Sequence, residues 1–422
     1  MTILQRIKRN VSFKFIGEIT SRILSVIFYI YVIRKLGDND FGVYSFVYSF
    51  CGILVILMDP GINTLLIRDI SRNRQVTGEY IGNISTIKII LSVVVLFLVN
   101  ILSVILKYSG EMLLYLNVMC IIMVCNSLME YIGAIFSSWE NMNYEAWLKI
   151  ANKIIIAILG TATLLAGYRL KEFLFSMAVA YALTLLVGFY LVQKKIILIK
   201  ILFDLKLCKH IIYNAFPMAL TMIFIILYLR IDVVLLQFMK WPDAAIGWYS
   251  AGMKIIETVS AIPLLITGGI FPVISELYKK NPERLEDVYR RSMEIMAASS
   301  IPLTFGLYFF PDKLVQILYG SEFIRTSDIL RILAWSTVFL FFNYSLMNFL
   351  IAVEKQKYVA ISTGICVLVN IISNLALIPR LGYFGTSISV VILQIVLLLM
   401  NYYFVFKYFY EGKNLLKIKL MA

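Results

Sequence analysis

The chain has 422 residues, of which 61% are hydrophobic and 15% are charged, with a formal net charge of +14. A soluble domain averages about 25% charged residues and cannot bury so much apolar surface, so a polytopic membrane protein is predicted. The basic residues lie mostly between apolar runs, which favours loops at an anionic membrane face over nucleic-acid binding. The five cysteines form no CxxC pair and His210 is the one histidine, so no disulfide framework, metal site or bound cofactor is predicted.

Twelve apolar segments are long enough, at about 20 residues each, to cross a bilayer as helices, which predicts an all-α fold. They lie at 12–33, 41–66, 81–106, 112–137, 145–167, 171–192, 211–238, 244–275, 292–311, 328–351, 358–378 and 383–406. In the second segment, Asp59 precedes Pro60 and Gly61, which predicts a break that serves as a hinge or gate. In the eighth, Pro263 and Pro272 are two places for a bend.

The basic residues also predict the orientation of the chain. More than half of the 39 lysines and arginines fall in segments on the side of the N-terminus. The positive-inside rule then places both termini in the cytoplasm. The first apolar run is too long for the apolar part of a signal peptide, so we expect a retained first helix.

The chain is predicted to consist of two six-helix lobes. The N-terminal lobe spans 1–192 and the C-terminal lobe spans 211–406. Between them, 193–210 alternates apolar and basic residues and is expected to be an amphipathic linker helix on the cytoplasmic membrane surface. A basic cytoplasmic tail follows at 407–422.

A repeated phrase supports a duplication of these lobes. Residues 40–45 read "DFGVYS" and residues 245–250 read "AIGWYS", each at the start of a long apolar run. Because each half has an even number of helices, the two halves enter the membrane in the same orientation, as parallel repeats do. In transporters built this way the substrate lies between the halves, and rocking of the halves gives alternating access.

Ionisable residues inside apolar segments are costly and indicate a polar interior. Lys14, Glu18 and Arg22 are four residues apart and share one face of the first helix. They leave one cation in excess, which favours an anionic ligand; the alternative is a ladder that only holds this helix to its neighbours. Lys149 and Lys153 also share a face, and snorkelling to the interface is an alternative for Lys149.

The second half carries its own charges. Arg230 and Asp232 are two residues apart and therefore point to different faces, whereas Lys254 and Glu257 are three apart and are expected to pair. Arginine and lysine suit phosphate groups because they donate charge-assisted hydrogen bonds. The cations proposed to bind an anionic substrate are Arg22, Lys14, Lys254, Arg230 and Lys153. The residues proposed for coupling or gating are Glu18, Asp59, Pro60, Asp232 and Glu257.

Catalytic signatures are missing from the sequence. It contains no GxxxxGK[ST] phosphate loop, no GxSxG and no HExxH, and it has no large loop on the outer side. A transporter is therefore predicted rather than an enzyme.

Several stretches together resemble a known family. They are "RKLGDNDFGVYSF", "DPG", "IRDISR", "LYLRIDVVLL", "GWYSAGMKI", "LYGSEF" and "LIPRLGYFGTSIS". In order and spacing they are similar to bacterial polysaccharide (O-antigen type) flippases of the multidrug/oligosaccharidyl-lipid/polysaccharide (MOP) exporter superfamily. Many relatives have Asp-Leu-Gly in place of "DPG", so the role of Asp59 does not carry over directly.

The resemblance implies two lobes that form a V around a central cavity. It implies transfer of an undecaprenyl-pyrophosphate-linked oligosaccharide to the outer leaflet of the bacterial inner membrane, for O-antigen or capsule synthesis. Arg22, Lys14 and Lys254 match the regions that contact the pyrophosphate, with Arg230 a weaker candidate. The implied partners are this substrate, membrane lipid, a polysaccharide polymerase and a chain-length regulator.

Two other functions stay open. A drug exporter of the same superfamily, driven by H⁺ or Na⁺, would prefer an acidic cavity, for which Glu18, Asp59 and Glu130 are available. A membrane glycan polymerase is disfavoured by the lack of a large outer loop.

Overall fold

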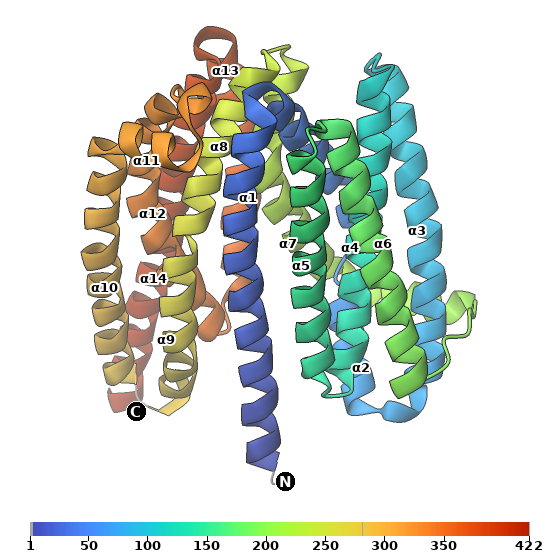
Figure 1. Ribbon diagram of the computed structural model, residues 1–422. Coiled ribbons are helices and arrows are strands. Elements are labelled where there is room, and N and C mark those ends of the chain that lie inside the picture. Colours follow the sequence, from blue (N-terminus) through green and yellow to red (C-terminus); the bar gives the residue numbers. More distant parts are fainter. Residues whose placement is uncertain (1–2, 281, 422) are drawn as a thin grey trace. The chain divides into compact units, whose positions relative to one another are not determined.

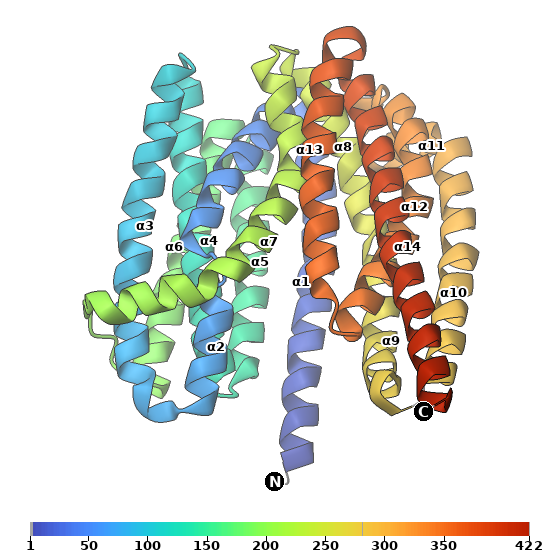
Figure 2. The same ribbon diagram turned by 180° about the vertical axis from the view of Figure 1, so that it is seen from behind.

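The computed structural model describes residues 3–280 and 282–421, apart from the side chains of 3–16, 216–218, 220–221, 279, 282–283 and 408–421. Within that part, all regular structure is helical (Figures 1 and 2). The α-helices are α1 (Ile3–Val55), α2 (Ile62–Arg72), α3 (Thr77–Ile105), α4 (Glu111–Ser138), α5 (Met142–Leu165), α6 (Leu170–Lys195), α7 (Leu205–Phe238), α8 (Asp243–Val259), α9 (Ala261–Lys280), α10 (Pro282–Phe309), α11 (Pro311–Leu318), α12 (Thr326–Ala352), α13 (Gln356–Leu381) and α14 (Tyr383–Met421). Short 3₁₀ turns are η1 (Ile56–Met58), η2 (Arg74–Val76) and η3 (Ser321–Phe323).

The helices have the length and composition of membrane spans. Among the described residues, nine helical segments are long and apolar enough to cross a membrane, or up to ten if the bent pair Arg284–Phe309 and Pro311–Leu318 is one span. All twelve predicted segments fall on helices. The first two count as one because α1 continues through Gly37, where only a left-handed φ of 76° marks the junction. The prediction of an all-α polytopic membrane protein is confirmed.

The chain divides into two compact units. Unit 1 comprises Met1–Leu36 and Val43–Ile226, and unit 2 comprises Gly37–Gly42 and Leu227–Ala422. The division falls inside α7, later than the linker predicted at 193–210. The short stretch 37–42 belongs to unit 2 although the rest of α1 belongs to unit 1.

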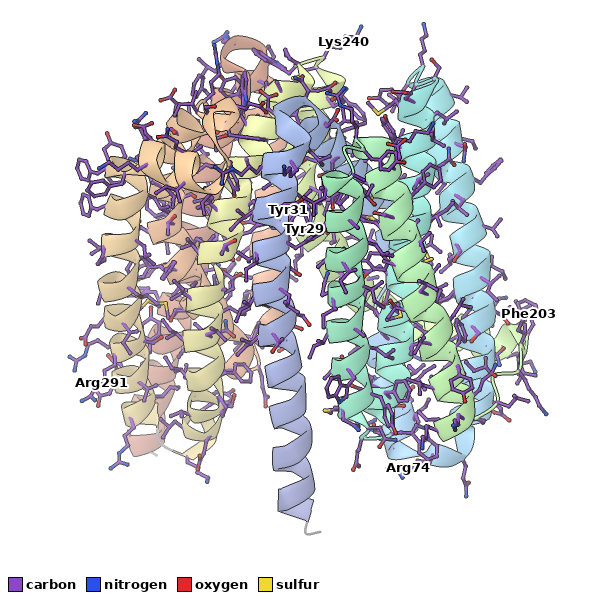
Figure 3. All side chains as sticks on the ribbon, in the orientation of Figure 1. Tyr29, Tyr31, Arg74, Phe203, Lys240 and Arg291 are labelled. Atoms are coloured by element: carbon purple, nitrogen blue, oxygen red, sulfur yellow. The ribbon has the colours of Figure 1, made fainter. Side chains whose placement is uncertain are left out.

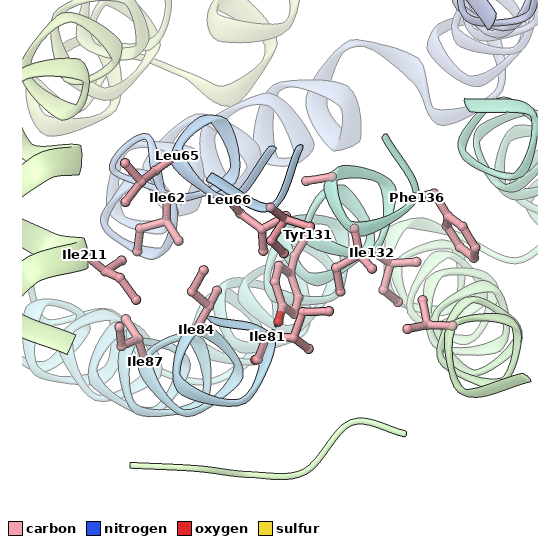
Figure 4. Close-up of a cluster of buried hydrophobic side chains, with 14 of the residues drawn as sticks. Ile62, Leu65, Leu66, Ile81, Ile84, Ile87, Tyr131, Ile132, Phe136 and Ile211 are labelled. Carbon is pink, nitrogen blue, oxygen red and sulfur yellow. Dashed lines mark hydrogen bonds between the residues drawn. The ribbon is translucent and has the colours of Figure 1, made fainter. Parts of the chain in front are cut away.

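The core of unit 1 is built from the inward faces of α2, α3 and α4. Ile62 and Leu66 of α2 pack with Ile84 of α3 and with Tyr131 of α4, as Figure 4 shows. Ile211 from the start of α7 joins the same cluster. In unit 2 the equivalent role falls to α12 and α14 with α9, α10 and α13, in a cluster of Ile274, Leu285, Leu346, Phe349, Leu350, Ala352, Val353, Val359 and Val405.

The predicted linker helix is wrong in part. Helix α6 continues to Lys195, residues 196–204 are not helical, and α7 begins at Leu205. The first part of α7 runs across α2 and α3 rather than along them (Figure 2). Instead of the hydrogen bonds of a helix, the stretch 196–204 makes hydrogen bonds to α3, at Gly82 and Thr86. Likewise α14 continues as helix to Met421, through the predicted tail.

The predicted break at Asp59 to Gly61 occurs, and the eighth predicted segment is interrupted near Pro263 but not at Pro272, which lies inside α9. Helix α1 ends at Val55, and α2 restarts at Ile62 after η1 and a left-handed Gly61 (φ 81°). The eighth predicted segment divides into α8 and α9 at Ser260. Pro263 explains this break because a proline ring clashes with the carbonyl group four residues earlier.

The repeated phrase has a structural counterpart inside unit 2. A Cβ atom on Gly42 would lie 1.8 Å from the carbonyl oxygen of Asp243, and one on Gly247 would lie 2.1 Å from the carbonyl oxygen of Asp38. The two contacts are reciprocal, since Asp38 and Gly42 are spaced like Asp243 and Gly247. The indole of Trp248 donates to Asp38 Oδ2 at 2.9 Å. The two junctions thus occupy equivalent positions, and glycine is required because backbone meets backbone there.

Candidate functional site

In unit 1, α1 and α5 carry a network of ion pairs. Arg22 Nε lies 3.0 Å from Glu18 Oε1, and Lys149 Nζ lies 3.8 Å from Glu18 Oε2 and 3.0 Å from Glu145 Oε1. Next to this network α1 and α5 pack closely, since a Cβ atom added to Gly17 would lie only 2.7 Å from the Cβ atom of Ala146. This approach brings Glu18 of one helix to Lys149 of the other.

The network corrects two expectations about charge. Arg22 is paired with Glu18 instead of being left in excess, and Lys149 joins two carboxylates instead of extending to the interface. Both cations nevertheless stay open, since the side chain of Arg22 is 50% exposed and that of Lys149 is 40% exposed. Charged side chains within membrane spans face the bundle interior or a water-filled cavity, which is therefore the environment expected for this network.

Two further predicted cations stand near this network in sequence. Lys153 follows Lys149 by one helical turn and is partly buried. The side chain of Lys14, one turn before Glu18, lies outside the described residues. The ion pairs described for α1 and α5 join two cations, Arg22 and Lys149, to two carboxylates, Glu18 and Glu145, and Lys153 adds a further cation to α5 one turn later.

In unit 2, the predicted pair between Lys254 and Glu257 is present. Lys254 Nζ lies 2.9 Å from Glu257 Oε2, and both side chains are about one-third exposed. Arg230 of α7 also acts electrostatically on Glu257. Lys254 is thus paired with a carboxylate in a partly open position.

Asp232 lies on a different face of α7 from Arg230, as predicted from their spacing, and is 3% exposed. Its Oδ2 accepts a hydrogen bond from Tyr249 Oη of α8 at 2.8 Å, and its Oδ1 accepts one from Asn374 Nδ2 of α13 at 2.9 Å. In the described structure Asp232 makes no ion pair, and the neighbouring Asn374 Oδ1 is buried without a hydrogen-bond partner. A buried carboxylate beside a spare amide oxygen can take up a proton or a small cation.

The broken helix between α1 and α2 is held at both ends by opposite charges. Lys88 of α3 is fully buried and its Nζ donates to the carbonyl oxygen of Met58, the last residue of η1. Asp59 Oδ1 accepts from the backbone nitrogen of Asn63, at 3.1 Å, in the first turn of α2. A cation at a helix C-terminus and an anion at an N-terminus both satisfy free backbone groups and oppose the helix dipole. Asp59 is therefore fixed by the break itself and lies apart from the ion pairs of α1 and α5.

Sequence reasoning missed several polar groups of these sites. Glu145 anchors Lys149 and is itself bonded to Ser137, while Asn374, Asn370 and Tyr249 surround Asp232. The two asparagines are four residues apart in the apolar segment "CVLVNIISNLALI", a spacing that puts both on one helix face. That pattern was the available signal for them.

Comparison with known proteins identifies the group to which the chain belongs. The sequence profile of the family described as "Polysaccharide biosynthesis protein" matches residues 7–278, which is well over half of the chain. The chain belongs to this family. A second profile, described as MatE, matches residues 217–376 and thus covers most of unit 2. The family therefore spans unit 1 and continues into unit 2.

Curated relatives of this polysaccharide biosynthesis protein are distant. It is 24% identical over 369 residues to the "Probable low-salt glycan biosynthesis flippase Agl15" of Haloferax volcanii, covering 84% of this chain and 74% of the relative. It is 21% identical over 415 residues to the "Capsular polysaccharide biosynthesis protein CapF" of Staphylococcus aureus, covering 94% and 98%. The first name describes a flippase and the second a protein of capsular polysaccharide biosynthesis.

Solved structures share the fold of this family member. An inward-facing multidrug resistance MATE family transporter of the MOP superfamily matches with a TM-score of 0.73 at 15% identity, over 91% of this chain and 93% of that one. The lipid II flippase MurJ, in an inward closed conformation, matches with a TM-score of 0.69 at 18% identity, over 93% and 87%. The chain thus shares the fold of these two transporters.

Proposed function

We propose that the protein carries a lipid-linked oligosaccharide, with undecaprenyl pyrophosphate as the lipid, from the cytoplasmic to the outer leaflet of a bacterial inner membrane. The partly exposed cations of α1 and α5 carry this proposal, because a pyrophosphate needs accessible positive charge inside the span. Arg22 and Lys149 bind the pyrophosphate, assisted by Lys153 and Lys14. Lys254 and Arg230 offer a second position, and the glycan serves O-antigen or capsule synthesis.

Coupling is assigned to Asp232. Its carboxylate takes up H⁺ or Na⁺ and exchanges that ion as the protein alternates between inward- and outward-open states. Support comes from its burial among neutral groups and from the unpartnered Asn374 Oδ1. The broken helix at Asp59 and Pro60 acts as the hinge, because bending at an existing break disrupts fewer backbone hydrogen bonds than bending a continuous helix. Glu18 and Glu257 hold the cations in place between substrates, and a polymerase and a chain-length regulator act on the exported units.

The test is complementation of a strain from which the gene for this chain has been deleted. Arg22→Ala and Lys149→Ala should each reduce surface glycan, and the double variant Arg22→Glu/Lys149→Glu should abolish it. Lys280→Ala is the matched control, since Lys280 forms an exposed ion pair with Glu276 at 2.9 Å of the same i,i+4 kind. Surface glycan staining, accumulation of lipid-linked intermediates and membrane abundance of each variant would be measured together.

Normal export by Arg22→Glu/Lys149→Glu at normal abundance would rule out pyrophosphate binding at this network. The same strains also test the other transport function. The MatE profile over residues 217–376 favours a drug exporter as the second candidate. If deletion leaves the surface glycan intact but increases sensitivity to cationic drugs, the exporter assignment replaces the flippase.

A further inference from the structure

The stretch from Ile196 to Tyr213, here named the basic shelf, is not used by the proposed transport mechanism. It comprises the non-helical residues after α6 and the first turns of α7. Ile197 and Ile199 point inward to the core of unit 1, while Leu198 and Lys200 point outward, as expected of an extended segment. The shelf therefore has one face packed on unit 1 and one face open.

The shelf is fastened to α3. Leu202 carbonyl oxygen accepts from Thr86 Oγ1 at 2.6 Å, and the Asp204 backbone nitrogen donates to Asn83 Oδ1 at 2.6 Å. Gly82 permits this contact, because a Cβ there would lie 2.6 Å from the carbonyl oxygen of Lys200. These bonds hold the exposed face in one conformation before any ligand arrives.

The exposed face is strongly apolar. Figure 3 shows Phe203 at the outer edge of unit 1. The large apolar side chains left open there are Leu198 (60%), Ile201 (69%), Phe203 (64%), Leu205 (56%), Ile212 (47%) and Tyr213 (80%). A hollow of about 580 Å³ lies beside them, lined by Lys209, His210, Ile212 and Tyr213.

The same face is basic. Lys200, Lys206 and Lys209 are exposed on it, and Lys194 and Lys195 precede it in the last turn of α6. The acidic residue of the shelf, Asp204, is engaged elsewhere, because its Oδ1 accepts from the backbone nitrogens of Lys206 and Leu207 at the start of α7. The lysines therefore present their charge outward.

The shelf is anchored near one end of the helical segment Arg74–Ile105, which is long and apolar enough to cross a membrane. Its anchor points Gly82 to Thr86 lie five to nine residues after the start of α3 at Thr77, which is roughly 7–14 Å along a helix. Amphipathic surface segments bury their apolar side about 5–10 Å into the boundary between headgroups and acyl chains. Lysines at this level meet lipid phosphates, and apolar side chains beside them meet the upper acyl chains.

We propose that the basic shelf is a binding site for acidic phospholipid, with lysines on the headgroup and Phe203 and Tyr213 between the acyl chains. This proposal does not depend on what the protein transports. It predicts that the chain retains phosphatidylglycerol in preference to phosphatidylcholine. Each lysine contributes about fivefold to the affinity, so the loss of three amounts to on the order of 100-fold.

The experiment uses the full chain purified in detergent and titrated with phosphatidylglycerol or phosphatidylcholine, with bound lipid counted by native mass spectrometry. The variant Lys200→Gln/Lys206→Gln/Lys209→Gln should lose preference for phosphatidylglycerol. The control Lys107→Gln/Lys171→Gln/Lys240→Gln removes the same charge from exposed positions elsewhere and should keep it. Phe203→Ser/Tyr213→Ser should weaken binding of both lipids, and inorganic phosphate should not displace phosphatidylglycerol from the wild type.

Equal retention of the two lipids by the wild type would overturn the proposal. So would an equal loss in the shelf triple variant and its control, since the effect would then come from net charge alone. Should the triple variant fail to fold, Lys200→Gln alone decides the matter, with an expected loss of about fivefold. Surface glycan export measured in parallel reports on the transport proposal separately.

Discussion

Glu18, Arg22 and Lys149 in unit 1 form ion pairs with side chains that are 40–50% exposed, whereas Asp232 in unit 2 is 3% exposed and bonded to neutral side chains. Open, paired cations can exchange a carboxylate for a phosphate at little cost, because exposed ion pairs contribute little to stability. A buried carboxylate gains nothing from such exchange but responds to a proton or a small cation. The proposed function follows this contrast, since it assigns substrate binding to the open cations of unit 1 and ion coupling to the buried carboxylate of unit 2.

The charged groups of the two units differ, but the backbone contacts at Gly42 and Gly247 resemble each other. Gly42 and Gly247 meet the carbonyl groups of Asp243 and Asp38 in reciprocal contacts, and the geometry of one nearly reproduces that of the other. The two junctions thus share a backbone crossing, whereas the charged residues of the two units differ.

The largest effect is expected at these junctions. Gly42→Ala and Gly247→Ala should each lower the free energy of unfolding by about 3 kcal/mol, the upper end for overpacking, because the added carbon atom overlaps a backbone carbonyl group. Thermal unfolding in detergent would measure both. If the junctions are true counterparts, the two losses are of similar size.

Gly268→Ala is the control for that pair. Gly268 lies in α9 with no atom within 4 Å of an added Cβ, so alanine there should stabilise by roughly 0.5–1 kcal/mol. A large loss at Gly42 with none at Gly247 would show that the reciprocal contacts are not equivalent, and the comparison of the junctions would fail.

The next effect is expected at Asp232. Asp232→Ala removes the acceptor for Tyr249 and Asn374, and at about 1 kcal/mol for each interhelical hydrogen bond the loss of stability is about 2 kcal/mol. Asp232→Asn keeps an acceptor oxygen and should lose less stability, yet it removes the negative charge. Export should therefore fall in both variants. An Asp232→Asn variant with normal, ion-dependent export would assign coupling to another residue.

The sequence was sufficient for the elements but not for the contacts. Apolar length predicted twelve segments that all fall on helices, and Pro60 and Pro263 marked the two breaks, because both signals are local. Pro272 was an equal candidate for a bend, but it lies inside α9. The prediction of a linker helix was wrong because Gly82, Asn83 and Thr86 contact residues more than a hundred positions away. Such contacts leave no local pattern in the sequence. Spacing alone correctly paired Lys254 with Glu257.

The charged residues show the same limit. Spacing put Glu18 and Arg22 on one face, but it could not show that Lys149 of α5 approaches Glu18, since this depends on Gly17 lying against Ala146. The partners of Asp232 on α8 and α13 were likewise outside the reach of periodicity. The helix-face argument separated Arg230 from Asp232 correctly because both lie on one helix.

The smallest effect on stability is expected for the ion pairs of Glu18 and Arg22. These variants give the most direct test of the contrast between the open ion pairs of unit 1 and the buried Asp232 of unit 2. Arg22→Gln and Glu18→Gln should each change the free energy of unfolding by about 0.5 kcal/mol or less, as exposed pairs do. Their effects on export should nevertheless differ, because Arg22→Gln removes a cation that is proposed to bind substrate, whereas Glu18→Gln removes only the carboxylate paired with it. Thermal unfolding and surface glycan staining of the two variants would be compared. If either variant lost about 2 kcal/mol or more of its free energy of unfolding, the ion pairs would serve mainly to hold α1 against α5. If the two variants lost export equally, the positive charge of Arg22 would have no special role in export.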